Sequence, residues 1–342
     1  MIAKVSMIGA GAWGTTLAVM ISQNRIPVKV WAYKKETAED INKFRENREF
    51  LPGIEIPSGV YATSDISEAV SESEFIIISS PSHTVRTVLK QLIPFLKKGA
   101  KIISVTKGIE EKTFATISEI ITDELVKSGN YDCRAAKNHV AVISGPNLAR
   151  EIAAGLPSTT VVASESKELR ESVQLMLANK RFRVYTSQDV IGLELGGSLK
   201  NVIAIGAGIC DGLNYGDNTK SAYLTRALRE MIRIGQFKGA NPETFYGLSG
   251  IGDLFATSYS KFSRNRTLGE KIALGNTCEQ AQKLITGIAE GIHTAKACYL
   301  FGRKEKVELP VINEMYGILY EGKPPQESVI SLMTRTLKGE ME

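Results

Sequence analysis

The sequence predicts an α/β fold in which a doubly wound, mostly parallel sheet is followed by an all-α domain. Three observations lead to this prediction. A strand, a glycine-rich turn and the start of a helix come first, and short β-branched runs then alternate with amphipathic stretches up to about residue 187. Beyond that point the β-branched runs stop and helical periodicity with small residues continues. We therefore expect one domain over residues 1–187 and an all-α domain over residues 188–342, packed together without a flexible linker.

The first expected strand is the apolar run Ile2–Ile8, which is followed at once by Gly-Ala-Gly-Ala-Trp-Gly and a helical pattern. Gly9 allows the tight turn, Gly11 lets the backbone approach a pyrophosphate, and Gly14 lets the helix pack close to the strand. The helix N-terminus offers N–H groups and a positive dipole end to the phosphates. A second strand over Val28–Tyr33 follows at the distance that a βαβ unit requires. The alternative is a purely structural turn, but this context favours a Rossmann-type dinucleotide-binding domain.

The remaining strands are expected where short apolar runs are bounded by turn residues, at Phe75–Ile78, Lys101–Val105, Val140–Ile143, Thr159–Ala163 and Phe182–Tyr185. A helix is expected over residues 83–96. Strands that alternate with helices form right-handed βαβ units, and ligands of such sheets bind beyond the carboxyl ends of the strands. The turns Ser79–Pro81, Lys107–Gly108 and Gly145–Pro146 follow three of the strands. We expect them to surround one crevice, with the site between the two domains.

Composition excludes several function classes. The 342 residues carry a net charge of +5 without a basic block, which argues against nucleic-acid binding and suits an anionic, phosphorylated ligand. The four cysteines form no CxxC pair, so neither a disulfide framework nor a metal site is expected. The N-terminus lacks a signal-peptide layout. Charged and amide side chains interrupt the most apolar stretch, Leu193–Ile209. We expect a cytoplasmic protein with no membrane span.

A glycine-rich stretch from Gly192 to Ile209 contains Lys200 among apolar residues. Glycine costs about 1 kcal/mol in a helix interior, so several glycines in one helix indicate very close packing. A lysine buried there has its pKa lowered from about 10.4 toward neutrality, where it can accept a proton. The alternative is a lysine at the helix surface whose ammonium reaches solvent. The spacing alone leaves both interpretations open.

A second polar cluster contains Asp253 among glycines, then Thr257, then Ser-Arg-Asn-Arg at residues 263–266. Arginine suits bidentate binding of a phosphate, and the neighbouring serine and asparagine add hydrogen-bonding groups. The same four residues could instead begin a solvated helix with Ser263 as its N-cap, and Asp253 could be only a turn residue. The three histidines lack an Asp or Ser partner at motif spacing. We therefore interpret them as structural or surface residues and prefer lysine as the acid and base.

Together these segments resemble the NAD(P)-dependent glycerol-3-phosphate dehydrogenase family over nearly the whole chain. Their order and spacing make the resemblance specific, although each string alone is weak. The matching strings are Gly9–Thr15, Thr106–Glu110, Ser144–Pro146, Glu194–Val202, Gly247–Leu254 and Ser263–Arg266. The resemblance implies hydride transfer between C4 of the nicotinamide and C2 of sn-glycerol 3-phosphate, which is interconverted with dihydroxyacetone phosphate. It also implies a homodimer and a supply of glycerol 3-phosphate for phospholipid synthesis.

The resemblance further implies a role for each matching position. Lys200 is the expected proton acceptor, Lys107 the expected contact to the alkoxide or carbonyl, and Asp253 the catalytic carboxylate that holds a lysine ammonium. The positions implied to bind the substrate are Lys107, Gly145, Asn147, Lys200, Asp253, Thr257, Ser263, Arg264 and Asn265. The positions implied to bind the cofactor are Gly9, Gly11, Ala12, Trp13, Gly14, Tyr33, Lys34, Lys107, Ala149, Arg264, Ile288 and Glu290.

Two positions depart from the expected pattern. Bacterial-type members usually carry Ser or Thr after the Gly-Pro pair, where this chain has Asn147, so the geometry of that contact is open. The second strand ends in Tyr33-Lys34-Lys35, where an NAD-specific Rossmann fold places Asp or Glu for the ribose 2′-hydroxyl, and the first acid is Glu36. Two lysines favour a 2′-phosphate, so we expect NADPH while NADH stays open. The alternative is a solvated strand end.

Two other functions stay open at this point. Another β-hydroxyacid-type dehydrogenase would share the Rossmann domain, the all-α domain and the catalytic lysine. Lys107-Gly108 and the group at residues 263–266 favour glycerol phosphate over a carboxylate substrate. A non-catalytic dinucleotide sensor would need only the cofactor-binding fold. Because Lys107, Lys200, Asp253 and Arg264 occur together, an enzyme is the preferred interpretation.

Overall fold

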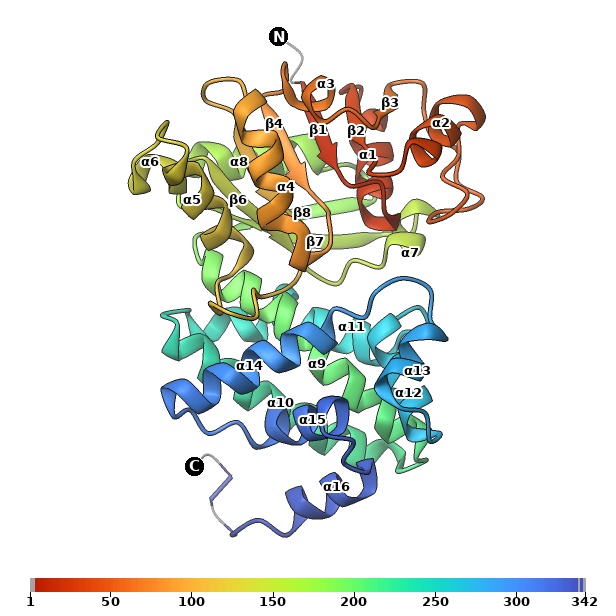
Figure 1. Ribbon diagram of the computed structural model, residues 1–342, viewed down its shortest axis with the longest axis vertical. Helices are drawn as coiled ribbons and strands as arrows, with labels where there is room; N and C mark the ends of the chain where they lie inside the picture. Colours follow the sequence, from red (N-terminus) through yellow and green to blue (C-terminus); the bar gives the residue numbers. More distant parts are fainter. Residues whose placement is uncertain (1–3, 338, 341–342) are drawn as a thin grey trace.

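The structure is a computed structural model that describes residues 4–337 and 339–340 (Figure 1). In the first half of these residues, eight strands form one sheet in the order β3-β2-β1-β4-β5-β6-β7-β8. Neighbouring strands are parallel except β6 and β7. The strands are β1 (Val5–Ile8), β2 (Val28–Trp31), β3 (Val60–Thr63), β4 (Phe75–Ile78), β5 (Lys101–Ser104), β6 (Val140–Ser144), β7 (Ser158–Ala163) and β8 (Phe182–Ser187). The predicted fold class is confirmed, and Ile2 and Ala3 of the first expected strand lie outside the described residues.

Helices cover both faces of the sheet. They are α1 (Ala12–Gln23), α2 (Lys35–Phe44), α3 (Ile66–Val70), α4 (Val85–Leu92), α5 (Ile117–Lys127), α6 (Cys133–Asn138), α7 (Ala149–Ala153) and α8 (Lys167–Leu177). Strand side chains alternate between the two faces, as their period of two requires. Met7 and Ile77 pack in a core with α1 and α8, whereas Ile8 and Ile78 pack in a second core with α4 and α5. β4, in the middle of the sheet, is accordingly a continuous apolar run, which is typical of a parallel sheet buried on both sides.

The turns at the carboxyl ends of the strands lie together. A Cβ at Gly9 would come within 2.9 Å of the backbone of Ser79, which follows β4. Thr106, which follows β5, donates a hydrogen bond from Oγ1 to the carbonyl oxygen of Ser80 at 2.8 Å. Lys107 Nζ donates to the carbonyl oxygen of Gly145 at 3.0 Å. The predicted clustering of these turns is confirmed, and it occurs where the strand order reverses at β1.

Two details of the predicted sheet domain are wrong. The sequence pattern does not predict β3, because Val60 is buried and Tyr61 exposed, so the segment lacks a continuous apolar run. Its position is set by pairing with β2 at the edge of the sheet. The helix expected over residues 83–96 is divided into a 3-10 turn at Ser82–Thr84, α4, and a second 3-10 turn at Ile93–Phe95. Pro94 lies in the first turn of that last segment, where a proline lacks the N–H that would continue α4.

The second half is helical and surrounds one long helix, α9 (Val190–Gly212), as Figure 1 shows. The others are α10 (Gly216–Phe237), α11 (Asp253–Tyr259), α12 (Arg264–Ala273), α13 (Cys278–Lys283), α14 (Gly291–Glu305), α15 (Pro310–Tyr320) and α16 (Pro325–Met333), with a 3-10 turn at Pro242–Tyr246 and a π-helical turn at Leu248–Gly252. A Cβ at Gly208 would overlap the carbonyl oxygen of Arg266, and one at Gly269 would overlap that of Ile205. The close packing predicted from the glycines of α9 is confirmed.

α9 is the one described helix that is long and apolar enough by composition to cross a membrane. Its apolar window is 89% buried by the surrounding protein. Such burial is typical of the central helix of a globular domain. A central helix is apolar because protein surrounds it, whereas a membrane span is apolar because lipid surrounds it. α9 therefore serves as the core of the helical half and presents its side chains to neighbouring helices.

Candidate active site

The glycine turn after β1 forms a cradle at the N-terminus of α1. Gly9 has a φ of +120°, which favours glycine, and a Cβ at Gly14 would overlap the carbonyl oxygen of Gly9. Gly11 differs, because a Cβ there would meet no described atom within 4 Å. No side chain caps α1 at Gly11. The open space and the helix N-terminus fit the pyrophosphate of a dinucleotide, which a side chain at Gly11 would displace.

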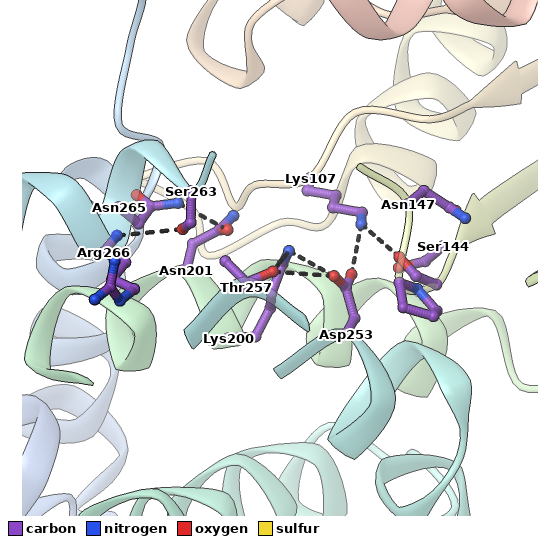
Figure 2. A network of polar contacts seen from close by, with 12 residues as sticks. Lys107, Ser144, Asn147, Lys200, Asn201, Asp253, Thr257, Ser263, Asn265 and Arg266 are labelled. Atoms are coloured by element: carbon purple, nitrogen blue, oxygen red, sulfur yellow. Dashed lines mark hydrogen bonds and ion pairs between the residues drawn. The ribbon is translucent and has the colours of Figure 1, made fainter. Parts of the chain in front are cut away.

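Lys200 projects from the middle of α9 and is only 6% exposed. Its Nζ donates hydrogen bonds to Asp253 Oδ1 at 2.7 Å and to Thr257 Oγ1 at 2.5 Å (Figure 2). Both acceptors lie on α11, four residues apart and therefore on one face of the helix. The interpretation of Lys200 as a buried lysine is confirmed, and the alternative of an ammonium that reaches solvent is wrong.

Asp253 joins Lys200 to a second lysine that comes from the sheet half of the chain. Its Oδ2 lies 2.5 Å from Nζ of Lys107, which is three residues after the end of β5. The same ammonium donates to the carbonyl oxygen of Gly145 at 3.0 Å. Figure 2 shows the carboxylate between the two ammonium groups. Asp253 is 2% exposed, so it is a buried bridge rather than only a turn residue.

Burial is the largest influence on Lys200 and lowers its pKa from 10.5 to about 8. The Asp253 carboxylate opposes this effect by its charge and its hydrogen bond. The cations of Lys107 and Arg264 lower the pKa further. A lysine with a pKa near 8 populates both protonation states close to neutral pH, which is what a general acid and base requires.

The Ser-Arg-Asn-Arg group begins α12 beside α9. Ser263 Oγ accepts a hydrogen bond from the backbone N–H of Arg266 at 3.2 Å, so the N-cap of the alternative interpretation is present. The helix start is not solvated, however, because Ser263 and Asn265 are buried. Asn265 Nδ2 donates to Asn201 Oδ1 at 3.0 Å, and its Oδ1 accepts from the N–H of Gly291 at 3.0 Å. These contacts place the group on the same side of α9 as the buried lysine (Figure 2).

The two arginines of this group have different surroundings. Arg266 binds Asp211 through Nε at 2.7 Å and Glu270 through Nη2 at 2.8 Å. Arg264 lies against Gly287, where a Cβ would come within 2.7 Å of its Nη1. Desolvation lowers the pKa of Arg264 below its ordinary value, and Glu290 opposes this effect. An arginine remains charged under such an influence, so Arg264 is the better placed of the two to bind an anionic ligand.

Two family models match the chain. The model described as the N-terminus of NAD-dependent glycerol-3-phosphate dehydrogenase matches residues 4–170, and the model described as its C-terminus matches residues 189–330. The chain belongs to this family. The membership confirms the resemblance predicted from the glycine turn and from the strings around Lys200, Asp253 and Arg264.

Similar proteins and solved structures carry the same family name. The glycerol-3-phosphate dehydrogenase (NAD(P)+) of Fusobacterium nucleatum is 41% identical and covers 99% of this chain and 99% of its own. That of Bacillus subtilis is 40% identical and covers 99% of this chain and 96% of its own. The crystal structure of glycerol-3-phosphate dehydrogenase from Coxiella burnetii has a TM-score of 0.91 and 33% identity, covering 97% of this chain and 99% of that chain. NAD or NADP is therefore the cofactor type of this family.

Ala149, predicted to contact the cofactor, lies beside α1, and Ile288 and Glu290, also predicted to do so, lie just before α14; their contacts with a cofactor stay predictions. Thr16 of α1 donates from Oγ1 to the carbonyl oxygen of Ala149 at 3.3 Å. Glu290 accepts hydrogen bonds from Ser82, at 3.3 Å from the N–H and 2.5 Å from Oγ. Ile288 is two residues earlier in the segment before α14 and is partly exposed. The segment before α14 thus contacts the 3-10 turn that follows β4.

Asn147, the first departure from the family pattern, uses both ends of its amide within the protein. Its Nδ2 donates to the carbonyl oxygen of Thr159 at 2.8 Å, and its Oδ1 accepts from Thr160 Oγ1 at 2.8 Å. These contacts bind the loop after β6 to the start of β7. The side chain of Asn147 therefore fixes the loop that carries Gly145, and its predicted contact to substrate stays a prediction.

Tyr33 and Lys34, the second departure, lie beyond the end of β2. Tyr33 is 85% exposed. Lys34 Nζ lies 2.9 Å from Glu49 Oε1, and Lys35 Nζ lies 3.6 Å from Glu39 Oε1. Both lysines that could attract a 2′-phosphate thus have carboxylate partners. Lys35 and Glu39 form an i,i+4 pair within α2, whereas the local sequence pattern does not indicate the contact of Lys34 with Glu49.

Four further residues of the site were not among the predicted site residues. Asn47 is buried and donates from Nδ2 to the carbonyl oxygen of Ala10 at 2.7 Å, which holds the glycine turn. Ser82 binds Glu290, and Asn201 binds Asn265. Ser144 has a buried Oγ without a hydrogen-bond partner among the described residues. The family strings contain Ser144 and Asn201 and so offered a signal, whereas no local pattern distinguishes Asn47 or Ser82.

Among the described residues, the contacts of the histidines are with residues other than Lys107 and Lys200. His293 Nδ1 lies 2.8 Å from Glu111 Oε1, and its ring lies 5.4 Å from that of His83. His139 Nδ1 lies 2.8 Å from the carbonyl oxygen of Ala135. These contacts agree with the structural interpretation of the three histidines and with lysine as the acid and base.

Proposed function

We propose that this chain catalyses the reversible oxidation of sn-glycerol 3-phosphate to dihydroxyacetone phosphate with NAD(P). The sheet domain, residues 1–187, holds the cofactor, and the helical domain, residues 188–342, holds the substrate. Family membership and the names of the similar proteins support this activity. The observation that carries the proposal is the buried Lys200 hydrogen-bonded to Asp253, because this arrangement supplies the proton transfer that such an oxidation needs.

Lys200 is the proposed proton carrier. During oxidation the C2 hydroxyl transfers its proton to the neutral Nζ of Lys200 as C2 loses a hydride. During reduction the Lys200 ammonium returns a proton to the carbonyl oxygen as C2 gains a hydride. NAD(P), when bound, accepts or donates that hydride at C4 of its nicotinamide. The pKa of about 8 supports this role in both directions.

Lys107 is proposed to contact the C2 oxygen of the substrate, and the start of α12 is proposed to bind its phosphate. The Lys107 ammonium, held by Asp253, stabilises the alkoxide that develops at C2 or polarises the carbonyl. Arg264 binds the phosphate, helped by the N–H groups and dipole at the N-terminus of α12. The further positions proposed to contact the substrate are Gly145, Asn147, Thr257, Ser263 and Asn265.

The cofactor is proposed to lie across the glycine turn, with its adenosine end near Lys34. The contact positions are Gly9, Gly11, Ala12, Trp13, Gly14, Tyr33, Lys34, Lys107, Ala149, Arg264, Ile288 and Glu290. We propose a preference for NADPH, since Lys34 and Lys35 follow the second strand. We also propose that the protein is a cytoplasmic homodimer that supplies glycerol 3-phosphate for glycerophospholipid synthesis, on the basis of the family alone.

The direct test measures dihydroxyacetone phosphate reduction in parallel with oxidation of 6-phosphogluconate and 3-hydroxyisobutyrate. Lys200→Ala is expected to lower kcat by about 10²–10⁴-fold, the usual contribution of a general acid or base, and to leave cofactor affinity nearly unchanged. Lys220→Ala is the matched control, because Lys220 is also buried and bound to an aspartate, Asp211, outside the site. Full activity of Lys200→Ala, or faster turnover of either carboxylate substrate, would contradict the proposal.

A further inference from the structure

A cavity of about 300 Å³ lies at the end of β2, next to the glycine turn. Its lining residues are Lys34, Glu36, Thr37, Asp40, Asn47 and Glu49. In a Rossmann-type fold, the residues at the end of this strand contact the ribose 2′ position of the cofactor and so distinguish NAD from NADP. Three of the six lining residues are acids and one is a lysine. The acids of the cavity therefore weaken the attraction that the two lysines of the strand end exert on a 2′-phosphate.

The lysine of this cavity is already paired. Lys34 Nζ donates a hydrogen bond to Glu49 Oε1 at 2.9 Å, and this contact raises the pKa of Lys34 above its ordinary value. The nearby Arg48 binds Asp40 through Nη2 at 2.7 Å. A 2′-phosphate that reaches Lys34 must therefore displace the Glu49 carboxylate or accept its repulsion at short range.

Glu49 belongs to a turn whose position is fixed by the glycine turn. Asn47 donates from Nδ2 to the carbonyl oxygen of Ala10 and to Oγ1 of Thr15, at 2.7 and 2.8 Å. The Oδ1 of Asn47 accepts a hydrogen bond from the N–H of Phe50 at 3.2 Å, which closes the turn that contains Glu49. The buried Asn47 thus couples the position of Glu49 to the part of the protein that fits the pyrophosphate.

We propose that Glu49 is a specificity-determining residue that limits affinity for the 2′-phosphate of NADPH and allows NADH to compete. The inference rests on the proposed function, because it assumes that the glycine turn binds NAD(P). With NADH, the Glu49 carboxylate is an acceptor for a ribose hydroxyl. With NADPH, it competes with the phosphate for Lys34. The acid comes from the segment between α2 and β3 rather than from the end of β2.

The test is a set of single and double variants of the full chain, with Kd for NADPH and for NADH measured by fluorescence titration. Glu49→Gln keeps an acceptor for the ribose hydroxyl and removes the charge. We expect it to bind NADPH about five- to tenfold more tightly, since Lys34 no longer has to leave its ion pair with Glu49 and the 2′-phosphate no longer meets a carboxylate. We expect its affinity for NADH to stay within about twofold of the native value. Lys34→Gln in the Glu49→Gln background should abolish the gain.

Two controls isolate the pair. Glu39→Gln removes an acid of α2 that pairs with Lys35 and does not line the cavity, and Glu36→Gln removes a lining acid that is not bonded to Lys34. A change of less than twofold in the NADPH-to-NADH affinity ratio of Glu49→Gln, or an equal change in Glu39→Gln, overturns the inference. If the native protein does not turn over dihydroxyacetone phosphate but Glu49→Gln still shows the affinity shift, the proposed function fails and the inference about Glu49 does not. The two failures are therefore distinguishable.

Discussion

Asp253→Asn is the substitution that most directly tests the electrostatics of the site. The native carboxylate contacts Nζ of Lys200 at 2.7 Å and Nζ of Lys107 at 2.5 Å. Asparagine keeps the shape and one acceptor but removes the negative charge between the two ammonium groups. Because Asp253 is the main influence that raises the pKa of Lys200 against burial, we expect that pKa to fall below about 8.

The size of the fall follows from the distance. Two unit charges 2.7 Å apart attract each other by about 1.5 kcal/mol in a water-like medium and about 6 kcal/mol at an effective dielectric constant of about 20. At about 1.4 kcal/mol per pH unit, and with part of the hydrogen bond retained, the pKa of Lys200 should fall by about one to three pH units. A fall of about two units would lower the protonated fraction at pH 7.5 by about 25-fold.

The assay is the pH dependence of kcat for dihydroxyacetone phosphate reduction. Because the proposed reduction step needs the Lys200 ammonium, the alkaline limit of the profile should move to lower pH in Asp253→Asn. Asp211→Asn is the matched control, since Asp211 also bridges two cations, Lys220 at 2.8 Å and Arg266 at 2.7 Å, outside the site. An unchanged profile in Asp253→Asn, or the same displacement in Asp211→Asn, would refute the reasoning.

The other expectations test charge, linkage and packing. Lys107→Gln removes a cation that lowers the pKa of Lys200, so the pH profile of the remaining reduction activity should move to higher pH, opposite to Asp253→Asn. Glu230 has a pKa raised from 4.5 to about 7, chiefly by burial; the folded state therefore holds its proton more tightly, and stability from this group falls by about 3 kcal/mol as pH rises from about 4.5 through 7. Denaturant unfolding at both ends of that range should show a loss about 3 kcal/mol smaller in Glu230→Gln than in the native protein. Buried Glu194, whose pKa is also raised to about 7, contributes a loss of its own in both proteins. Gly11→Ala should unfold like the native protein, because its Cβ would meet no described atom within 4 Å. It should bind NADPH and NADH at least about tenfold more weakly, because the same Cβ enters the space proposed for the pyrophosphate. Gly208→Ala should instead lower the free energy of unfolding by about 1–3 kcal/mol, because its Cβ overlaps the backbone of α12, and native-like thermal unfolding would contradict that packing.

Features that depend on local backbone requirements are predictable from this sequence. The turn at Gly9 demands a positive φ, and the turn occurs where the pattern places it. The burial of Lys200 is not predictable in this way, because the sequence leaves both a buried and a surface lysine open and only the packing of α9 on all sides decides between them. β3 is different, because Val60–Thr63 has no strong pattern of its own and is a strand through its pairing with β2.

Partners distant in sequence are the part of the site that local patterns do not predict. The contact of Lys200 with Asp253 joins residues 53 positions apart, and that of Lys34 with Glu49 depends on how the segment after α2 returns to the sheet. Asn147 has the composition of a ligand-binding residue, yet β7 occupies both ends of its amide. Each case requires knowledge of which segment packs against which, and periodicity within one element does not contain that information.

The arrangement of charges links substrate binding to proton transfer. Lys107 comes from the sheet half, whereas Lys200, Asp253 and Arg264 come from the helical half. Lys107 and Arg264 both lower the pKa of Lys200, and Asp253 raises it. A phosphate at Arg264 would neutralise one of the two cations, and the pKa of Lys200 would rise as the substrate binds. In the proposed function, bound dihydroxyacetone phosphate would therefore favour the protonated lysine that its own reduction requires. This is a physical reason for placing the proposed phosphate-binding arginine within electrostatic range of the proposed proton carrier.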